Sequence, residues 1–587
     1  MTIRLSISVA ALAGTFLFAD TALARIFQIW TEAVQLEANI RPGSEGSDPT
    51  WLAVYNGTLY FSAKGDDQGV ELWSYDGGSA ARVSNISPGS GDSFPAWLTV
   101  YDGALYFSAS DSPLNAELWR FDGSNSSLVA DIRPGPTGSH PGGLTVFDGA
   151  LYFSAYDGNG RRRLWRYDGA AATIMSGTED VSKVQELTVH DGYLWFLAQT
   201  SGENFGRIWR TDGQDTQSIA LIDSLNLSEH SELVSAGPNL YASLRDSNYG
   251  RELWRVTING LLVEDIFPGE NSSNPRALTW FDNKMYMSAR IHEPGSGAIY
   301  GTELVRFDGM EAELVHDIFN VLNGSSCPAW MTEFLNALYF SADNVVGRGC
   351  PSAVTDAESA WTGRELYKHD PEKNTTILLK DINESESSSP FNGSSNPRWF
   401  THGPPAALSA TLYFSADDGV NGRELWSIRR TRTRIEVLLY PQWTPAEMIN
   451  PWEWQAELRT EDIEVDVAMA AFLLTPDGRA RFFDRVDVNL PRGQEHSERI
   501  VTGHGMGTES GIVTLAVAVF DKQRGDLIGI ETASVGIDER VDEKIQAEMH
   551  RRATSVLRSL SLKTLTELEP GSILTAEPER ASKGRIP

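Results

Sequence analysis

Cysteine is nearly absent from this chain, whose 587 residues include only Cys327 and Cys350. So few thiols rule out a disulfide-dense scaffold and a zinc site made of four cysteines. In an oxidising compartment, two cysteines this close in sequence are candidates for one structural disulfide. We predict that bond, and two unpaired buried thiols are the alternative.

Long apolar runs are also missing, except at the N-terminus. There Arg4 precedes an apolar stretch from Leu5 to Phe18, and Ala22-Leu23-Ala24 supplies a small-x-small cleavage pattern. This order predicts a signal peptide over residues 1–24. A short membrane anchor is the alternative, but the stretch is short for a bilayer. We therefore expect an exported protein, secreted, periplasmic or on the extracellular surface, with no transmembrane segment.

Positive charge is scarce, since 49 Lys and Arg stand against 79 Asp and Glu and give a net charge of −30. Such a surface repels phosphate backbones and anionic lipid headgroups. We therefore expect no nucleic-acid partner, and we expect a monomer. Familiar catalytic signatures are missing as well, because the sequence contains neither HExxH nor a serine in a G-x-S-x-G elbow.

What the chain has in abundance is one repeat. The string LYFSA, or a close variant, recurs with spacings of 46, 46, 43, 46, 45, 53 and 74 residues. Its copies begin at Leu59, Leu105, Leu151, Leu194, Leu240, Met285, Leu338 and Leu412. A second string, ELW or a variant, follows each copy. Repeats of this period are typical of propellers, solenoids and arrays.

Residues 97–132 show the repeated unit most clearly. WLTVY leads through Asp102-Gly103 to ALYFSA, and ELWRF leads through Asp122-Gly123 to SLVADI. Asp-Gly between two β-prone runs is a strong hairpin signal, because both turn residues tolerate positive φ. The unit is therefore a four-stranded antiparallel meander of about 45 residues, the size of a propeller blade.

The two ends of the array predict a closed ring. The chain after the leader begins with a lone fourth strand, Val34 to Ile40, whereas the last unit has only three strands, ending at Trp426. The N-terminal strand supplies what the last unit lacks, which removes two exposed sheet edges. We predict an all-β propeller of about eight blades over residues 25–430. Seven or nine blades, or an open rod, are the alternatives.

These residues resemble a known family. GVELWSYDGG, AELWRFDGS, GRELWRVTING and GVNGRELW are similar to the bacterial ELWxxDGT repeat (hyalin-like) β-propeller proteins, over residues 34–428. The resemblance implies an exported or surface-associated propeller and no assigned activity. The sequence departs from the family pattern at Val305 and Tyr367, where the tryptophan is replaced.

The C-terminal part changes character. Strand pairs of unrelated sequence over residues 431–537 predict a small immunoglobulin-like β-sandwich. The spacing of Val541, Ile545, Met549 and Leu557 predicts a helix within residues 538–562. The remaining residues, 563–587, have the composition of a disordered tail.

Two residue patterns allow a ligand. Asp66-Asp67, Asp157 to Asn159 and Asp417 to Asn421 lie between second and third strands and could supply oxygen ligands to calcium. Ordinary turn chemistry is the interpretation we favour, because no loop carries a full ligand set. The repeated Trp and Tyr could form a sugar-stacking platform, but at fixed strand positions they more often pack blade against blade.

Two functions from different classes remain open. The first is a secreted or cell-envelope-associated binding or scaffold protein whose propeller presents loops to a protein or polysaccharide. The second is a secreted carbohydrate-active hydrolase or lyase with a site at the propeller channel. Carboxylates gathered with a His or Arg at one channel mouth would favour the enzyme. The sequence assigns no catalytic, cofactor-binding or metal-binding residue, so binding is the function that we expect.

Overall fold

The computed structural model describes most of the chain. The described residues are 23–66, 69–203, 206–221, 231–246, 248–257, 260–267, 272–292, 299–318, 324–343, 363–384, 393–405, 409–442, 452–460, 465–474, 480–490, 495–502, 511–521, 527–537, 543–557, 568 and 573–574. They fall into two compact units, Ala33–Arg429 and the remainder. Most of the predicted signal peptide and Cys350 lie outside the described residues, so the leader and the disulfide stay predictions.

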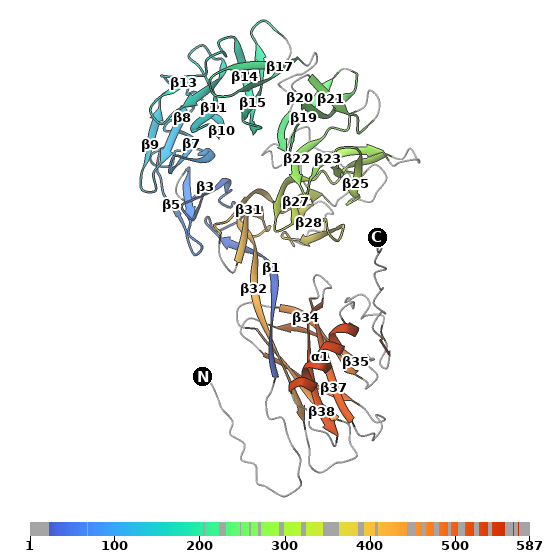
Figure 1. The fold of residues 1–587 in the computed structure, drawn as a ribbon. Coiled ribbons are helices and arrows are strands. Elements are labelled where there is room, and N and C mark those ends of the chain that lie inside the picture. The colour runs from blue at the N-terminus through green and yellow to red at the C-terminus, as the bar shows by residue number, and fades with distance from the viewer. Residues whose placement is uncertain are drawn as a thin grey trace. The chain divides into compact units, whose positions relative to one another are not determined.

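The first unit is an eight-bladed β-propeller of four-stranded antiparallel sheets, as predicted (Figure 1). Seven blades are formed by consecutive strands. The strands of blades one to four are β2 (Thr50–Tyr55), β3 (Thr58–Lys64), β4 (Val70–Tyr75), β5 (Ala80–Arg82), β6 (Ala96–Tyr101), β7 (Ala104–Ser110), β8 (Ala116–Phe121), β9 (Ser126–Ala130), β10 (Gly142–Phe147), β11 (Ala150–Tyr156), β12 (Arg162–Tyr167), β13 (Ala172–Ile174), β14 (Val181–His190), β15 (Tyr193–Thr200), β16 (Gly206–Thr211) and β17 (Thr216–Leu221). Those of blades five to seven are β18 (Glu232–Ala236), β19 (Asn239–Asp246), β20 (Gly250–Thr257), β21 (Gly260–Glu264), β22 (Arg276–Phe281), β23 (Lys284–His292), β24 (Ile299–Phe307), β25 (Ala312–His316), β26 (Ala329–Phe334), β27 (Ala337–Asp343), β28 (Arg364–Asp370) and β29 (Thr375–Lys380).

The eighth blade closes the ring and is shared between the two ends of the array. It consists of β30 (Arg398–His402), β31 (Ser409–Asp417), β32 (Arg423–Gln442) and β1 (Leu23–Ala38), and β1 pairs with β32. The Glu37 carboxylate on β1 accepts hydrogen bonds from Arg429 on β32, at 2.7 and 2.6 Å, and from the Tyr75 hydroxyl of blade one. Closure by the N-terminal strand is therefore confirmed.

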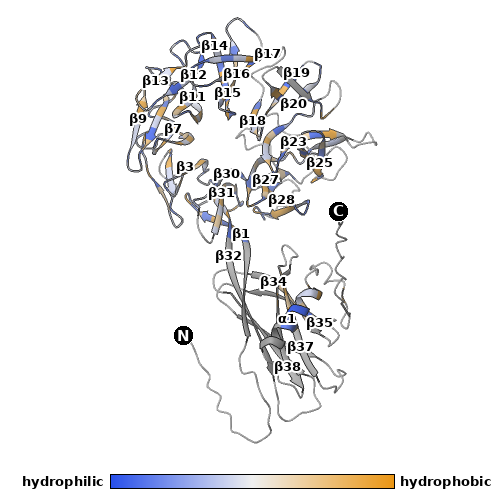
Figure 2. Cartoon of the chain, viewed as in Figure 1, coloured by the Kyte–Doolittle hydropathy of each residue, from blue (hydrophilic) through white to orange (hydrophobic). Residues whose placement is uncertain are grey.

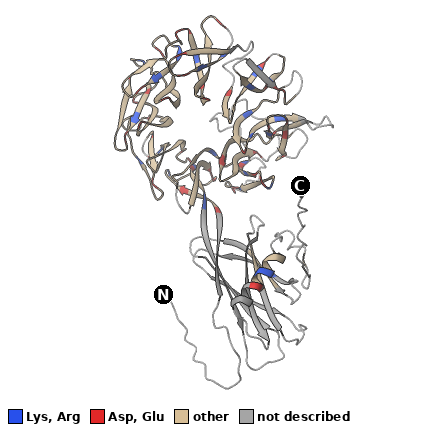
Figure 3. Ribbon diagram, viewed as in Figure 1, with Lys and Arg blue, Asp and Glu red and all other residues tan. Residues whose placement is uncertain are grey.

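The repeated strings explain how neighbouring blades pack. In blade two, Leu105, Tyr106, Phe107 and Ala109 of β7 are all buried. Their side chains alternate between the two faces of the sheet, and each face packs against an adjacent blade. Figure 2 shows hydrophobic residues in the strands of every blade, and Figure 3 shows charged residues of both signs distributed around the ring. The ELW tryptophans join these interblade clusters; Trp119 and Trp165 are examples.

The glutamate of ELW holds the linker that leads to the next blade. In blade six, the buried Glu303 accepts hydrogen bonds from the Ile318 amide (3.1 Å) and from the amide (2.7 Å) and hydroxyl of Ser326. Six glutamates hold a linker in this way, and we call them the clamp glutamates: Glu71, Glu117, Glu252, Glu303, Glu365 and Glu424.

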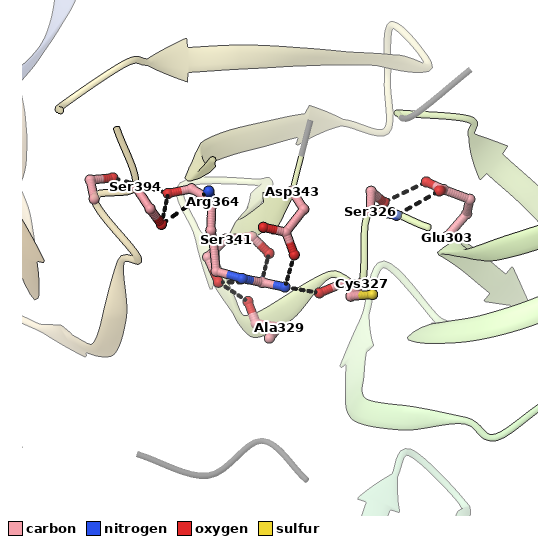
Figure 4. A network of polar contacts seen from close by, with 9 residues as sticks. Glu303, Ser326, Cys327, Ala329, Ser341, Asp343, Arg364 and Ser394 are labelled. Atoms are coloured by element: carbon pink, nitrogen blue, oxygen red, sulfur yellow. Dashed lines mark hydrogen bonds and ion pairs between the residues drawn. The ribbon is translucent and has the colours of Figure 1, made fainter. Parts of the chain in front are cut away.

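A buried arginine holds the backbone in blade seven. Arg364 donates hydrogen bonds to the carbonyl of Cys327 at 2.6 Å and to Asp343 at 2.9 Å (Figure 4).

The second unit contains the other strands and a helix. Its elements are β33 (Trp452–Thr460), β34 (Val465–Leu474), β35 (Ala480–Leu490), β36 (Glu495–Thr502), β37 (Gly511–Asp521), β38 (Leu527–Ile537), α1 (Glu543–Leu557) and β39 (Ile573–Leu574). One sheet has the strand order β38-β37-β34-β35-β39. In another sheet, β33 pairs with β32 and β36 pairs with β33. The immunoglobulin-like β-sandwich expected for this part of the chain stays a prediction.

Helix α1 belongs to the core of this second unit. Ala553, Val556 and Leu557 pack with Phe472 of β34 and Phe520 of β37. Val541, which we assigned to the helix, lies outside the described residues. Residues 563–587 have the composition of a disordered tail, but β39 in this segment pairs with β35 through Ala480↔Leu574. A strand of two residues is too short to be predicted from the sequence. The described residues include no helix that combines the length and apolar character needed to cross a membrane.

Candidate functional site

The first strand of each blade lines the central channel and begins with a backbone irregularity in seven of the eight blades. First strands of consecutive blades contact one another around the ring. A register shift lies between Thr50 and Ala53 in blade one, between Ala96 and Thr99 in blade two, and at the matching place in five more. Bulges of this kind re-aim a side chain. One residue in each of these seven blades is thereby re-aimed, and Glu232 occupies the matching position in blade five without a register shift.

The residue at this position differs from blade to blade. In blade order these mouth residues are Trp51, Trp97, Gly143, Glu186, Glu232, Ala277, Trp330 and Trp399. Four tryptophans therefore come from four consecutive blades around the closed ring, seven, eight, one and two. The two glutamates come from blades four and five. The mouth thus has an aromatic side and an acidic side.

The four tryptophans form a continuous arc of contacting rings. Ring centroids are 4.3 Å apart for Trp97 and Trp51, 4.3 Å for Trp51 and Trp399, and 4.8 Å for Trp399 and Trp330. Each pair is tilted by 41 to 47° rather than stacked flat. Trp97, at one end of this tryptophan arc, is 41 % exposed. The arc is thus an aromatic surface that solvent reaches.

The backbone of the tryptophan arc is strained. Trp51, Trp97, Trp330 and Trp399 have φ values of 55°, 60°, 56° and 62°. An L-residue in this left-handed region costs on the order of 1–3 kcal/mol. Gly142, next to the arc, leaves room for it, because a Cβ there would lie 3.2 Å from Nε1 of Trp97. The same left-handed backbone recurs at Gly143, Glu186 and Ala277, with φ values of 65°, 55° and 52°, so it belongs to the repeated bulge and not to the tryptophans alone.

A cavity of about 240 Å³ lies against the arc. The rings of Trp51, Trp330 and Trp399 form part of its wall, and the other lining residues are Leu52, Leu98, Met331, Thr332, Phe400 and Thr401. The Thr401 hydroxyl donates a hydrogen bond of 2.9 Å to the carbonyl of Leu52 in the next blade. The wall therefore joins the last and first blades and combines apolar side chains with hydrogen-bonding groups. One of these groups is the Nε1–H of Trp399, which is buried and has no hydrogen-bond partner among the described residues.

The acidic side carries two carboxyl groups with perturbed protonation. Protein surrounds Glu186 within the channel although its side chain still meets solvent, and this burial together with the neighbouring Glu232 raises the pKa of Glu186 to about 8. Burial also raises the pKa of Glu232, against the lowering effect of hydrogen bonds from the Leu278 and Ala277 amides, each 2.8 Å long. Arg276 and Arg251 act on Glu232 in the same lowering direction.

Carboxylates gathered with a His or Arg at one channel mouth would favour an enzyme, and this arrangement partly meets that condition. Two carboxyl groups lie at the mouth, and Arg276 is close to Glu232. It also offers what a binding site needs, namely an aromatic surface, a cavity and hydrogen-bond acceptors. The repeated aromatics are the alternative sugar-stacking platform of the sequence analysis, which does not separate the mouth tryptophans from those of ELW. Tryptophan recurs only in some copies of the strand that precedes LYFSA, but this variation does not show where the side chains point.

The acidic loops are held by their own backbones. Asp157 accepts hydrogen bonds from the amides of Asn159 (2.8 Å) and Arg161 (2.9 Å), and Asp418 accepts from Val420 and Asn421. This is the turn chemistry that we favoured. Among the residues that the structure describes, no three Asp, Glu, His or Cys side chains gather closely enough to hold a metal ion. Calcium stays an untested alternative.

No family model matches the chain, and no curated protein matches it. Solved structures similar to it include a puromycin hydrolase mutant complexed with PGG, with 12% identity over 69% of this chain and a TM-score of 0.35. Another is a prolyl endopeptidase with 13% identity over 62% of this chain and 52% of its own, and a TM-score of 0.34. The chain spans 61% of the length of the hydrolase.

A third similar structure is the SapL1 lectin in complex with alpha methyl fucoside, with 13% identity, coverage of 58% of this chain and 95% of the lectin, and a TM-score of 0.26. At such identities the likeness concerns the fold alone. TM-scores this low carry no argument about function.

Proposed function

We propose that this protein is an exported binding module whose ligand enters the propeller at the channel mouth and lies against the tryptophan arc. The observation that carries the proposal is the arc itself, four contacting indoles from four consecutive blades, held in a strained backbone conformation. The fold does not require tryptophan at this position, because blades three and six have Gly143 and Ala277 there with the same left-handed backbone. Recognition of a ligand would account for the four tryptophan side chains.

The context supports an extracellular or periplasmic role. The leader-like N-terminus and the resemblance to the ELWxxDGT repeat proteins favour export. The net charge of −30 opposes nucleic acid as a partner. We propose that the protein acts as a monomer toward a protein, a polysaccharide or a smaller ligand exposed at the cell envelope.

The test is a glycan and cell-surface binding array probed with the full chain and two variants. In Trp97→Gly the arc loses its exposed end, and blade two acquires the residue that blade three has naturally. Tyr249→Ala removes an aromatic side chain of similar exposure, 38 %, from a loop of blade five. We expect ligands whose signal falls at least tenfold with Trp97→Gly and persists with Tyr249→Ala. Ligands that bind both variants equally well would refute a site at the arc.

A second candidate function, a carbohydrate-active hydrolase or lyase, is favoured by one observation. Burial raises the pKa of Glu186 to about 8, and a second carboxyl group, that of Glu232, is its neighbour; a protonated carboxyl beside another is what general acid catalysis uses. A panel of glycan substrates, incubated with the wild-type chain and with Glu186→Gln, tests this function. Turnover that the substitution abolishes would establish it, and no turnover on any substrate that binds would leave binding as the function.

A further inference from the structure

The cavity beside the tryptophan arc has hydrogen-bonding groups that the protein leaves unused. The Nε1–H of Trp399, which lines the cavity, is buried and has no hydrogen-bond partner among the described residues. A buried donor without a partner is unfavourable, and a ligand that accepts its hydrogen bond removes this penalty. Four other described tryptophans have the same unpartnered group but do not line the cavity: Trp73, Trp119, Trp209 and Trp426. Trp399 therefore favours a ligand that carries a hydrogen-bond acceptor.

A threonine of the cavity wall supplies a second unused group. The Thr401 hydroxyl donates to the Leu52 carbonyl of the next blade at 2.9 Å, and Thr99 donates in the same way to Leu144 at 3.2 Å. Thr332 has the same register position in blade seven, opposite the tyrosine of LYFSA. Its hydroxyl makes no hydrogen bond among the described residues, and its side chain is only half-buried. This hydroxyl can therefore donate a hydrogen bond to a ligand or accept one from it.

The rest of the wall restricts the charge and the shape of the ligand. The nine lining residues include no acidic or basic side chain, so an ionised group in the cavity would lose hydration without meeting an opposite charge. The rings of Trp51 and Trp330 are tilted by 47° and 46° from that of Trp399, so they do not form parallel plates for a flat aromatic ligand. An uncharged, puckered ring whose C–H groups meet the negative faces of the indoles fits this wall.

We infer that the cavity binds one uncharged sugar ring of a carbohydrate ligand, with its C–H face against the indoles and its hydroxyl groups bonded to Trp399 and Thr332. This inference rests on the proposed function and names the chemical class of its ligand. A sugar hydroxyl accepts the Nε1–H of Trp399, and another exchanges a hydrogen bond with the Thr332 hydroxyl. The cavity volume of about 240 Å³ equals that of about eight liquid waters at about 30 Å³ each, which is room for one such ring.

The test titrates the full chain with methyl glycosides of glucose, galactose, mannose and N-acetylglucosamine, and with maltotriose and cellotriose. Binding is followed by tryptophan fluorescence and calorimetry. For each hexose that binds, the corresponding uronate and 2-amino sugar place a negative or a positive charge on the same ring. We expect saturable binding of at least one uncharged sugar, and at least tenfold weaker binding of both charged counterparts.

Two substitutions in the cavity and one matched control locate the sugar. Trp399→Phe keeps an aromatic ring but removes the unpartnered N–H, and Thr332→Val removes the hydroxyl with little change of shape. We expect each to weaken binding of the uncharged sugar by about three- to tenfold, the effect of one hydrogen bond. Thr279→Val alters the same repeat position in blade six, outside the cavity, and should bind normally. A urea midpoint for each variant shows that it is folded.

Each other outcome is decisive. Charged counterparts that bind as tightly as the uncharged sugar, or an affinity that neither cavity substitution changes, would overturn the inference. No carbohydrate bound in the titrations or in the array, together with a cell-surface protein that binds and is lost in Trp97→Gly, would refute the sugar and leave the proposed function standing. No ligand of any class that depends on Trp97 would overturn both.

Discussion

The clamp that closes the ring should matter as much to stability as the clamps inside it. In the eighth blade, Glu424 accepts hydrogen bonds from the amides of Ile40 and Arg41, each 3.0 Å long, and from the Ser47 hydroxyl at 2.5 Å. Glu424→Ala removes all three hydrogen bonds. The lost hydrogen bond costs about 2 kcal/mol of stability at the buried Ser47 and about 1 kcal/mol at each half-exposed amide. About 1 kcal/mol is regained, because the variant has no carboxylate to desolvate on folding. We therefore expect a net destabilisation of about 3 kcal/mol.

The measurement is urea unfolding at pH 7, followed by tryptophan fluorescence. Glu303→Ala, an internal clamp of the same geometry, should lose a similar amount, and the exposed Glu311→Ala should change stability by less than about 0.5 kcal/mol. If Glu424→Ala resembles Glu311→Ala while Glu303→Ala is destabilised, the N-terminal segment does not hold the ring closed and the reasoning fails.

Four further predictions follow from the same structure. Burial raises the pKa of Glu303 to about 7, so the folded state favours the protonated form of this carboxyl group. The free energy of unfolding should therefore fall as pH rises from about 4.5 through 7. Urea midpoints measured at each pH should show this decrease, and Glu303→Gln should remove part of it. Trp97→Gly should be more stable than Trp97→Ala by about 0.5–1 kcal/mol, because only glycine relaxes at a φ of 60°, and equal urea midpoints would contradict the strain argument. Non-reducing peptide mapping should find Cys327 linked to Cys350, and two alkylated thiols would refute the disulfide. Leu557→Ala should destabilise the second unit by about 3 kcal/mol, since its side chain is fully buried against the sheet; a thermal scan with unchanged transitions would show that α1 is dispensable.

The propeller could be predicted from sequence because its signals are local and repeated. The Asp-Gly turns fix the hairpins, and the lone strand beginning near Val34 matches the gap in the last blade. Both features depend only on residue type and order along the chain. The same local logic identified the turn chemistry of Asp157 and Asp418.

The channel mouth could not be predicted in the same way. Trp51 and Trp73 both lie in aromatic strands, and only the bulge between Thr50 and Ala53 decides that the first is directed toward the channel. A bulge has no residue signature strong enough to read from one sequence. Nor does the spacing alone show that Glu186 and Glu232 lie beside each other, because their proximity depends on how the first strands of blades four and five pack.

The second unit was predicted less fully for a related reason. Ala468 and Phe472 on β34 are buried, and so is the intervening Met469, whose side chain points to the opposite face. A strand with two buried faces shows that a layer covers each face, but not which element forms that layer. Helix α1 forms one of these layers; the spacing of its apolar residues predicts the helix but not the sheet face against which it packs.

The most direct measurement is ¹⁹F NMR of the full chain labelled with fluorotryptophan, during titration with a ligand identified by the array. The chain has 17 tryptophans, and substituting Trp51, Trp97, Trp330 and Trp399 one at a time by Phe assigns the four resonances of the arc. The account predicts that these four resonances shift on binding while those of interblade tryptophans such as Trp119 stay in place. Shifts confined to the interblade tryptophans, or no shift at saturating ligand, would contradict it.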